Sequence, residues 1–312
     1  MLGACTLLGF SVSGCGSDDE TAKTTGPQQP GPQPIELEMH VDNVPVGIEA
    51  TQCRKLRIGN TGPVAIGRLV NDISNSSHHF VVSSIDEGTD EALEERPEPY
   101  DCDPFRAPLF GSPLAITQKH HDAYELPPGI GYALGPNAMI HLELHYINTT
   151  AAPVNITART QLVPLAEGTL EHEASVMVVG TLNVNIPPNS DATTGPVFQQ
   201  IESPKYDDVS IYAMTGHTHR YGTDVKVSTM ESPDGERTAR YDLKPFVWDA
   251  PEVVSFNPAF QVNPAGGFEY SCSWHNPTPE TVTFGESATQ EMCFFWVYYY
   301  PAKEGRALFL TR

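Results

Sequence analysis

The sequence predicts an all-β protein of β-sandwich type. Glycine (25) and proline (28), which are poor in helix interiors and common at turns, are frequent among the 312 residues. No long stretch places apolar residues at i, i+3, i+4 and i+7. Short β-branched and aromatic runs separated by Pro, Gly and Asn dominate instead, and this pattern is typical of antiparallel sandwiches.

The strand-like runs fall into two series, with a break around residues 164–173. This break predicts an N-terminal sandwich over 36–165 and a C-terminal sandwich over 166–312. The acidic, Pro-rich stretch 86–137 is expected to be loop. We expect strands at 36–42, 63–70, 78–84, 139–147 and 154–163, and then at 175–186, 208–214, 223–230, 252–256, 281–284, 293–300 and 307–311.

Length and charge limit the classes of function. A chain of this length with 39% hydrophobic residues can form two domains of ordinary size, each with a buried core. The formal charge of −21 excludes a nucleic-acid-binding role, because a phosphate backbone requires a basic face. Solubility is one explanation of the acidity, and attraction of cations or of a basic partner is another.

The N-terminus has features of an export signal. Residues 2–14 are small and apolar. This run is too short to span a membrane, but it has the length of the apolar core of a signal peptide. Val12-Ser13-Gly14-Cys15 resembles a bacterial lipobox, so Cys15 is a candidate for lipidation within a 1–15 signal region. A plain secretion signal and a chance apolar N-terminus stay open, since no Lys or Arg precedes Lys23.

Residues 16–35 are polar and rich in Pro, Gly and Gln, which predicts a disordered tether. We therefore expect the folded part in the cell envelope or outside the cell, as in a bacterial lipoprotein. Contact with a membrane would be made only through the lipid on Cys15.

Four cysteines stand beyond this N-terminal region, namely Cys53, Cys102, Cys272 and Cys293. They allow three pairings. Joining near neighbours would place one bridge in each half of the chain, and an oxidising compartment favours disulfides over free buried thiols.

The most specific histidine motif is His217-Thr218-His219, which follows the strand-like run 209–213. Residues two apart on a strand share a face, so both imidazoles can reach one metal. A thioether beside two imidazoles suits reduced copper and not Zn, Ca or Mg. Met292, next to Cys293, is the candidate for that third ligand.

A second histidine set is less regular. Neighbours such as His78 and His79 share a metal only where the strand is bulged, and the preceding residues 74–77 are a turn signal. His145, on the same face of a predicted strand as His141 and Glu143, is the candidate third imidazole. His120-His121 lies in a polar stretch and is expected to be no ligand pair.

These motifs occur in an order that resembles the copper type II ascorbate-dependent monooxygenase family, which includes dopamine β-hydroxylase and peptidylglycine α-hydroxylating monooxygenase. The similarity covers most of residues 45–300. Its parts are Cys53 ahead of His78-His79, then 126–131 and 142–146, then Ile186-Pro187-Pro188, His217-Thr218-His219, 284–287, Glu291-Met292-Cys293 and Tyr299-Tyr300-Pro301.

The resemblance implies two jelly-roll sandwiches with a solvent-exposed cleft between them, and two copper ions per chain. His78, His79 and His145 would hold the electron-transfer copper. His217, His219 and Met292 would hold the catalytic copper. The resemblance also favours the bridges Cys53–Cys102 and Cys272–Cys293, and it implies ascorbate or another one-electron donor, O₂ and a small-molecule substrate.

Some positions depart from the peptide-hydroxylating member. An Arg that holds its substrate carboxylate is replaced here by Thr215, and an Asn and a Tyr after its Met-Cys are replaced by Phe294 and Trp296. We therefore do not expect a role in peptide amidation. We expect a less polar substrate.

The hypothesis that follows is an exported copper monooxygenase that hydroxylates a C–H bond. A soft sulfur ligand at Met292 favours Cu(I), the state that meets O₂. Two alternatives stay open: a copper-binding or copper-storage envelope protein on the same scaffold, and a metal-free adhesion-type sandwich.

Overall fold

The structure is a computed structural model, and it describes residues 33–104, 110–287, 289–304 and 307–311. The predicted lipidation site Cys15, with the signal region and residues 16–32 of the tether, lies outside the described residues. Within the described ranges, no helix has the length and hydropathy needed to cross a membrane.

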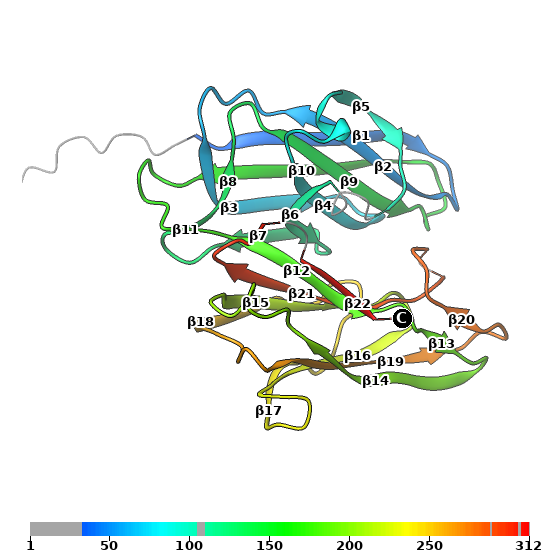
Figure 1. The fold of residues 1–312 in the computed structure, drawn as a ribbon. Coiled ribbons are helices and arrows are strands. Elements are labelled where there is room, and N and C mark those ends of the chain that lie inside the picture. Colours follow the sequence, from blue (N-terminus) through cyan, green and yellow to red (C-terminus); the bar gives the residue numbers. More distant parts are fainter. Residues whose placement is uncertain (1–32, 105–109, 288, 305–306, 312) are drawn as a thin grey trace, which may run out of the picture. The chain divides into compact units, whose positions relative to one another are not determined.

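The first sandwich consists of two facing sheets (Figure 1). One has the order β1 (Ile35–Val44), β10 (Val154–Pro164), β3 (Val64–Ile73), β8 (Ile130–Leu134) and β11 (His172–Glu173), with β7 (His121–Glu125) also paired to β3. The other has the order β5 (Arg96–Asp101), β2 (Glu49–Arg57), β9 (Met139–Ile147), β4 (Ser77–Ile85) and β6 (Gly111–Thr117).

The prediction of a loop over 86–137 is wrong. That stretch holds β5 to β8 and the 3-10 turn η1 (Asp90–Ala92). The two prolines of β5, Pro97 and Pro99, hid this strand from the sequence pattern. They are tolerated because β5 is an edge strand, where a missing N–H need not break the ladder.

The second sandwich also consists of two sheets. One has the order β18 (Val254–Phe260), β15 (Ser210–His217), β21 (Cys293–Tyr300), β12 (Ser175–Thr181) and β22 (Leu308–Thr311). The other has the order β14 (Ser190–Gln200), β19 (Gly267–Asn276), β16 (Gly222–Met230) and β17 (Arg237–Asp242). The short strands β13 (Asn185–Ile186) and β20 (Val282–Thr283) form a separate pair.

The two sandwiches share one topology. In the first, β1-β10-β3-β8 faces β2-β9-β4-β6; in the second, β12-β21-β15-β18 faces β14-β19-β16-β17. Both are the strand order of a jelly roll, in which the first and last strands pair within one sheet. The predicted all-β sandwich class is confirmed. In chain order, β11 is the last strand that pairs within the first sandwich, and β12 is the first that pairs within the second.

Strand β21 is buried on both faces, which explains its unbroken apolar sequence. Its odd-numbered residues, from Cys293 to Tyr299, lie in the core of the second sandwich. Its even-numbered residues Phe294, Trp296 and Tyr298 lie in a core that includes most of the first sandwich. One continuous apolar core therefore joins β21 to the first sandwich.

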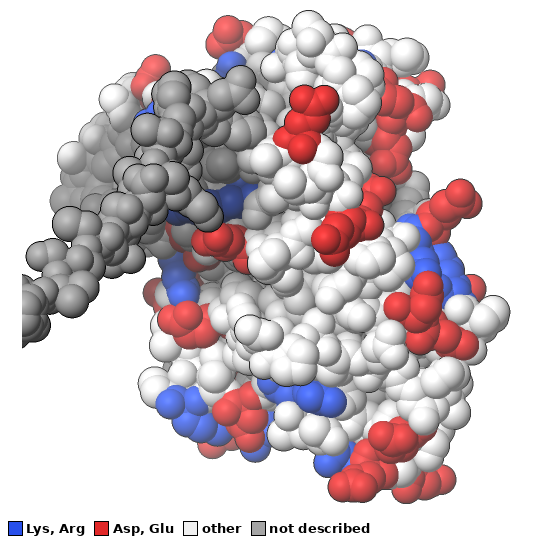
Figure 2. Space-filling view, turned by 90° about the vertical axis from the view of Figure 1, so that its left-hand side faces the viewer, with Lys and Arg blue, Asp and Glu red and all other residues white. Residues whose placement is uncertain are grey.

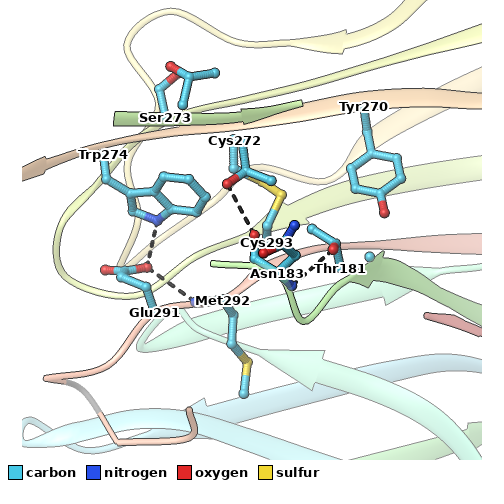
Figure 3. Close-up of a disulfide and its surroundings, with 12 residues drawn as sticks. Thr181, Asn183, Tyr270, Cys272, Ser273, Trp274, Glu291, Met292 and Cys293 are labelled. Carbon is cyan, nitrogen blue, oxygen red and sulfur yellow. Dashed lines mark hydrogen bonds between the residues drawn. A yellow bond between two sulfur atoms is a disulfide. The ribbon is translucent and has the colours of Figure 1, made fainter. Parts of the chain in front are cut away.

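Two disulfides close the predicted near-neighbour pairs. Cys53 in β2 bonds Cys102, which follows β5, with a Cα–Cα distance of 5.9 Å. Cys272 in β19 bonds Cys293 in β21, with a Cα–Cα distance of 5.7 Å, and so ties the two sheets of the second sandwich together (Figure 3). Outside these cores, acidic side chains are spread over the surface among fewer basic ones, as the face in Figure 2 shows.

Candidate metal centre

Three histidines of the first sandwich meet at the start of β4. His79 in β4 is paired with His145 in β9, and the register shifts between Ser77 and His79. Ser76 has a φ of 72°, so the predicted irregularity before the His-His pair is present. One ring nitrogen from each of His78, His79 and His145 lies within 4.8 Å of the others.

The carboxylates around these rings indicate which nitrogens face the centre. His145 Nε2 lies 3.0 Å from Glu49 Oε1, and His79 Nε2 lies 3.8 Å from Glu143 Oε1. The Nδ1 atoms of His78 and His79 are 3.1 Å apart. That is about the separation of two imidazole nitrogens on one ion, and carboxylates on the outer nitrogens are typical of metal-bound histidines.

His217 and His219 form a second pair, with ring centroids 5.2 Å apart. His217 is the last residue of β15, and His219 lies in the turn that follows. The His219 carbonyl accepts the Gly222 N–H at 3.0 Å. A Cβ at Gly222 would lie 1.9 Å from Thr218 Oγ1, so only glycine fits this turn as it stands.

The Nδ1 atoms of this pair are both turned to protein acceptors. His217 Nδ1 lies 3.0 Å from Gln118 Oε1. His219 Nδ1 lies 3.0 Å from the carbonyls of Ser287 and Gln290. A ring that donates through Nδ1 presents Nε2 as its acceptor or ligand atom, so Nε2 is the metal-binding atom in this pair.

Glu291 holds the backbone of this pair beside Met292. Its carboxylate accepts the N–H groups of His219 at 2.8 Å, Tyr221 at 2.7 Å and Met292 at 3.3 Å. It also accepts the indole N–H of Trp274 at 2.8 Å (Figure 3). Burial raises the pKa of Glu291 to about 7, against the effect of these four donors, which favour the ionised form.

Met292, the predicted sulfur ligand, directly precedes β21 and is buried in the same core as Phe294 and Trp296. Its side chain extends away from the Cys272–Cys293 bridge (Figure 3). Trp296 lies against His217, with ring centroids 4.9 Å apart. The place of Met292 on a metal stays a prediction.

The two histidine sets are close to each other. The ring centroids of His78 and His219 are 6.1 Å apart. The Trp248 ring covers the His78 ring, with centroids 5.3 Å apart. Four residues after Trp248, Glu252 forms an ion pair with Lys119 at 2.7 Å. All six predicted ligands are buried.

Comparison with known families assigns the second half of the chain. Residues 172–308 match the model of the copper type II ascorbate-dependent monooxygenase, C-terminal domain, a segment that includes His217, His219 and Met292. This match assigns residues 172–308 to the copper type II ascorbate-dependent monooxygenase family.

No curated protein matches this chain. The major capsid protein P2 of bacteriophage PM2 is similar to it at 10% identity and a TM-score of 0.37, over 86% of this chain and 99% of that one. The structure of infectious bursal disease virus Gt strain is similar at 10% identity and a TM-score of 0.18, over 90% of this chain and 80% of that one. Likenesses of this degree bear on neither fold nor function.

His78, His79, His217 and His219 favour the neutral form, which is the form that binds a metal. Burial, and then the neighbouring histidines, lower the pKa of His78 to about 2. Burial is also the main cause that lowers the pKa of His219 to about 4 and those of His79 and His217 well below the usual value. Neutral imidazole is the ligand form, so no proton must leave these rings near pH 7.

The residues fit the copper that the family implies. Two buried ring nitrogens that face the centres, His145 Nδ1 and His219 Nε2, have no hydrogen-bond partner among the described residues. Buried polar atoms are normally satisfied, and an ion held by these rings would satisfy those that face it. Imidazole and thioether donors suit copper. The structure therefore offers a histidine triad and a histidine pair with a nearby methionine.

Two other histidine groups have partners within the protein. His120 and His121 contact the Ile73 carbonyl and the Asp72 carboxylate, respectively. Cys53 and His141 lie close to Glu143, but the Cys53 sulfur is in a disulfide and is no thiolate donor.

Sequence reasoning missed the residues that orient the ligands: Glu49, Gln118, Trp248 and Glu291. Glu291 stands next to Met292 in a motif already singled out, so its position was visible although its role was not. Gln118 precedes the misleading His120-His121 pair and carried no signal of its own.

Proposed function

We propose that this chain is a copper-dependent monooxygenase that hydroxylates a C–H bond of a small substrate. The observation that carries the proposal is the pair of buried histidine sets, in which outer nitrogens are fixed by protein acceptors. The reaction R–H + O₂ + 2 e⁻ + 2 H⁺ → R–OH + H₂O takes its electrons one at a time from ascorbate or a similar donor. The bound copper ions would store those electrons and activate O₂.

The chain's own residues hold the ligands ready and keep water out. Gln118 and the carbonyls of Ser287 and Gln290 fix the second pair of rings, so that Nε2 faces the centre. Glu49 contacts Nε2 of His145 and so turns this ring until its Nδ1 faces the centre. Trp248 shields His78. Preorganised ligands of this kind need no rearrangement when the metal binds.

Location is a second part of the proposal. The apolar N-terminus with Cys15 and the polar tether after it support export and attachment to the cell envelope. The two disulfides fit an oxidising compartment. Labelling of Cys15 with a fatty-acid analogue in a bacterial host tests the lipid anchor, and Cys15→Ser is its control.

Metal counting followed by O₂ uptake tests the function. We expect two copper ions per chain and ascorbate-driven O₂ consumption coupled to product in the presence of substrate. Copper uptake without that consumption would support a storage protein, and absence of stoichiometric copper would support a metal-free sandwich. Met292→Leu, which conserves volume, should abolish turnover and leave the fold intact. Retained activity in copper-replete Met292→Ala would refute the sulfur assignment.

A further inference from the structure

A cavity of about 250 Å³ lies beside the Met292 part of the metal centre. Residues of both sandwiches line it, among them Ile116 of β6, Val178 of β12 and the β21 neighbours of Met292. Its walls are almost entirely apolar. The one ionisable side chain that lines it, Glu286, is exposed to solvent.

The cavity shares a wall with the predicted catalytic ligands. Met292 and Trp296 both line it, and Trp296 also contacts the His217 ring, with centroids 4.9 Å apart. A molecule in the cavity would therefore lie against the predicted sulfur ligand and one residue away from His217.

The aromatic part of the wall is held in place by packing. The Phe294 ring lies 6.0 Å from Phe284 and 6.3 Å from Trp296, measured between centroids. Gly180 makes room for it, since a Cβ at that position would lie 1.9 Å from Phe294 Cδ1. At the opening, Leu308 and Leu310 are each more than a third exposed and present an apolar rim.

We propose that this cavity is the substrate site, and that the substrate is a small neutral apolar molecule, such as a hydrocarbon ring with a short side chain. The inference rests on the proposed function. Burying an unpaired charge or polar group against these walls would cost several kcal/mol. A dry apolar cavity of roughly 150 Å³ accommodates benzene, so this cavity has space for a ring with a short chain.

Binding to the metal-free protein tests the site without relying on catalysis. Ethylbenzene is the probe, titrated by calorimetry against the full chain, and 2-phenylethylamine is the cationic comparison with the same carbon frame. We expect saturable binding of ethylbenzene, at least tenfold tighter than that of the amine. Tighter binding of the amine would overturn the proposal, because it would show recognition of charge.

Two variants place the probe in this cavity. Leu182→Trp fills it, and Leu310→Arg puts a charge at its rim; each should weaken ethylbenzene binding at least tenfold. Leu93→Trp, at an exposed position outside the cavity, is the matched control and should bind like the parent. Thermal melts establish that the variants fold. Ethylbenzene binding that neither folded variant weakens would contradict the assignment.

Failure of the site and failure of the function give different results. With copper, O₂ and ascorbate, ethylbenzene should yield 1-phenylethanol and water, with two electrons drawn from the donor. If the metal-free protein binds ethylbenzene but the copper-loaded protein consumes no O₂, the proposed function is wrong and the cavity assignment stands. If the loaded protein hydroxylates a polar substrate and ethylbenzene does not bind, the cavity assignment is wrong.

Discussion

His217 Nδ1 lies 3.0 Å from Gln118 Oε1, and both residues are buried. Gln118 follows β6 of the first sandwich, whereas His217 ends β15 of the second. The first sandwich thus selects the tautomer of a predicted ligand in the second. An amide oxygen only accepts, so the imidazole N–H must be on Nδ1.

Gln118→Leu should weaken copper binding at the second site by about 10–100-fold, the usual effect of removing a partner of a ligating histidine. Competition with a Cu(I) chelator measures this change. One copper ion should be lost at a lower chelator concentration than the other. Gln118→Glu keeps an acceptor oxygen and should retain most of the affinity. Equal affinities in the Leu and Glu variants would show that the contact does not orient His217.

Glu291→Gln should lower the free energy of unfolding by about 2–4 kcal/mol at pH 8, where the carboxylate is ionised. Four N–H donors converge on this group, and an amide replaces one acceptor oxygen by a competing donor. Urea denaturation measures the change. Glu236→Gln, at an exposed position, is the control and should lie within about 0.5 kcal/mol of the parent.

Removing the Cys272–Cys293 bridge by alanine at both positions should cost about 3 kcal/mol, and removing Cys53–Cys102 about 4 kcal/mol. The difference follows from the loops that the bridges close, which span 21 and 49 residues. Urea denaturation of both double variants checks the order. A larger loss of stability on removal of Cys272–Cys293 would indicate that linking the two sheets contributes more than loop length does.

Tyr298→Phe should leave the free energy of unfolding unchanged or raise it by up to about 1 kcal/mol. The Tyr298 hydroxyl is buried and has no hydrogen-bond partner among the residues that the structure describes, so removing it loses no bond. Tyr124→Phe is the matched comparison, because the Tyr124 hydroxyl donates to Ile116 O at 2.6 Å and contacts Asp122 at 2.8 Å. It should cost about 1–2 kcal/mol.

Local sequence pattern was sufficient for the fold class and for many strands. The runs at 139–147 and 154–163 correspond closely to β9 and β10, because neither run is broken by Gly or Pro and the buried residues of β10 alternate with more exposed ones. Outside the stretch 86–137, the strands β2, β14, β17 and β19 were not predicted, and within it β5 was missed as well. Of these, β5 and β14 contain proline, and β14 has a register shift between Thr194 and Val197, so these two lack the periodicity that identifies a strand.

The candidate site was predictable only where its residues are neighbours in the chain. His78-His79 and His217-Thr218-His219 are visible as pairs, and a bulge before His79 followed from the turn residues ahead of it. The contacts that orient these rings join positions about 70 to 100 residues apart, such as Gln118 with His217 and Glu49 with His145. Strand order decides such pairings, and no local pattern encodes them.

The apolar core that β21 shares with the first sandwich limits how this chain can be cut. A fragment that begins near residue 172, where the family match starts, would expose Phe294, Trp296 and Tyr298 on a single sheet face. Such a face promotes aggregation. A soluble truncated version would therefore need polar replacements along the even-numbered positions of β21, and those replacements would remove the wall beside Met292.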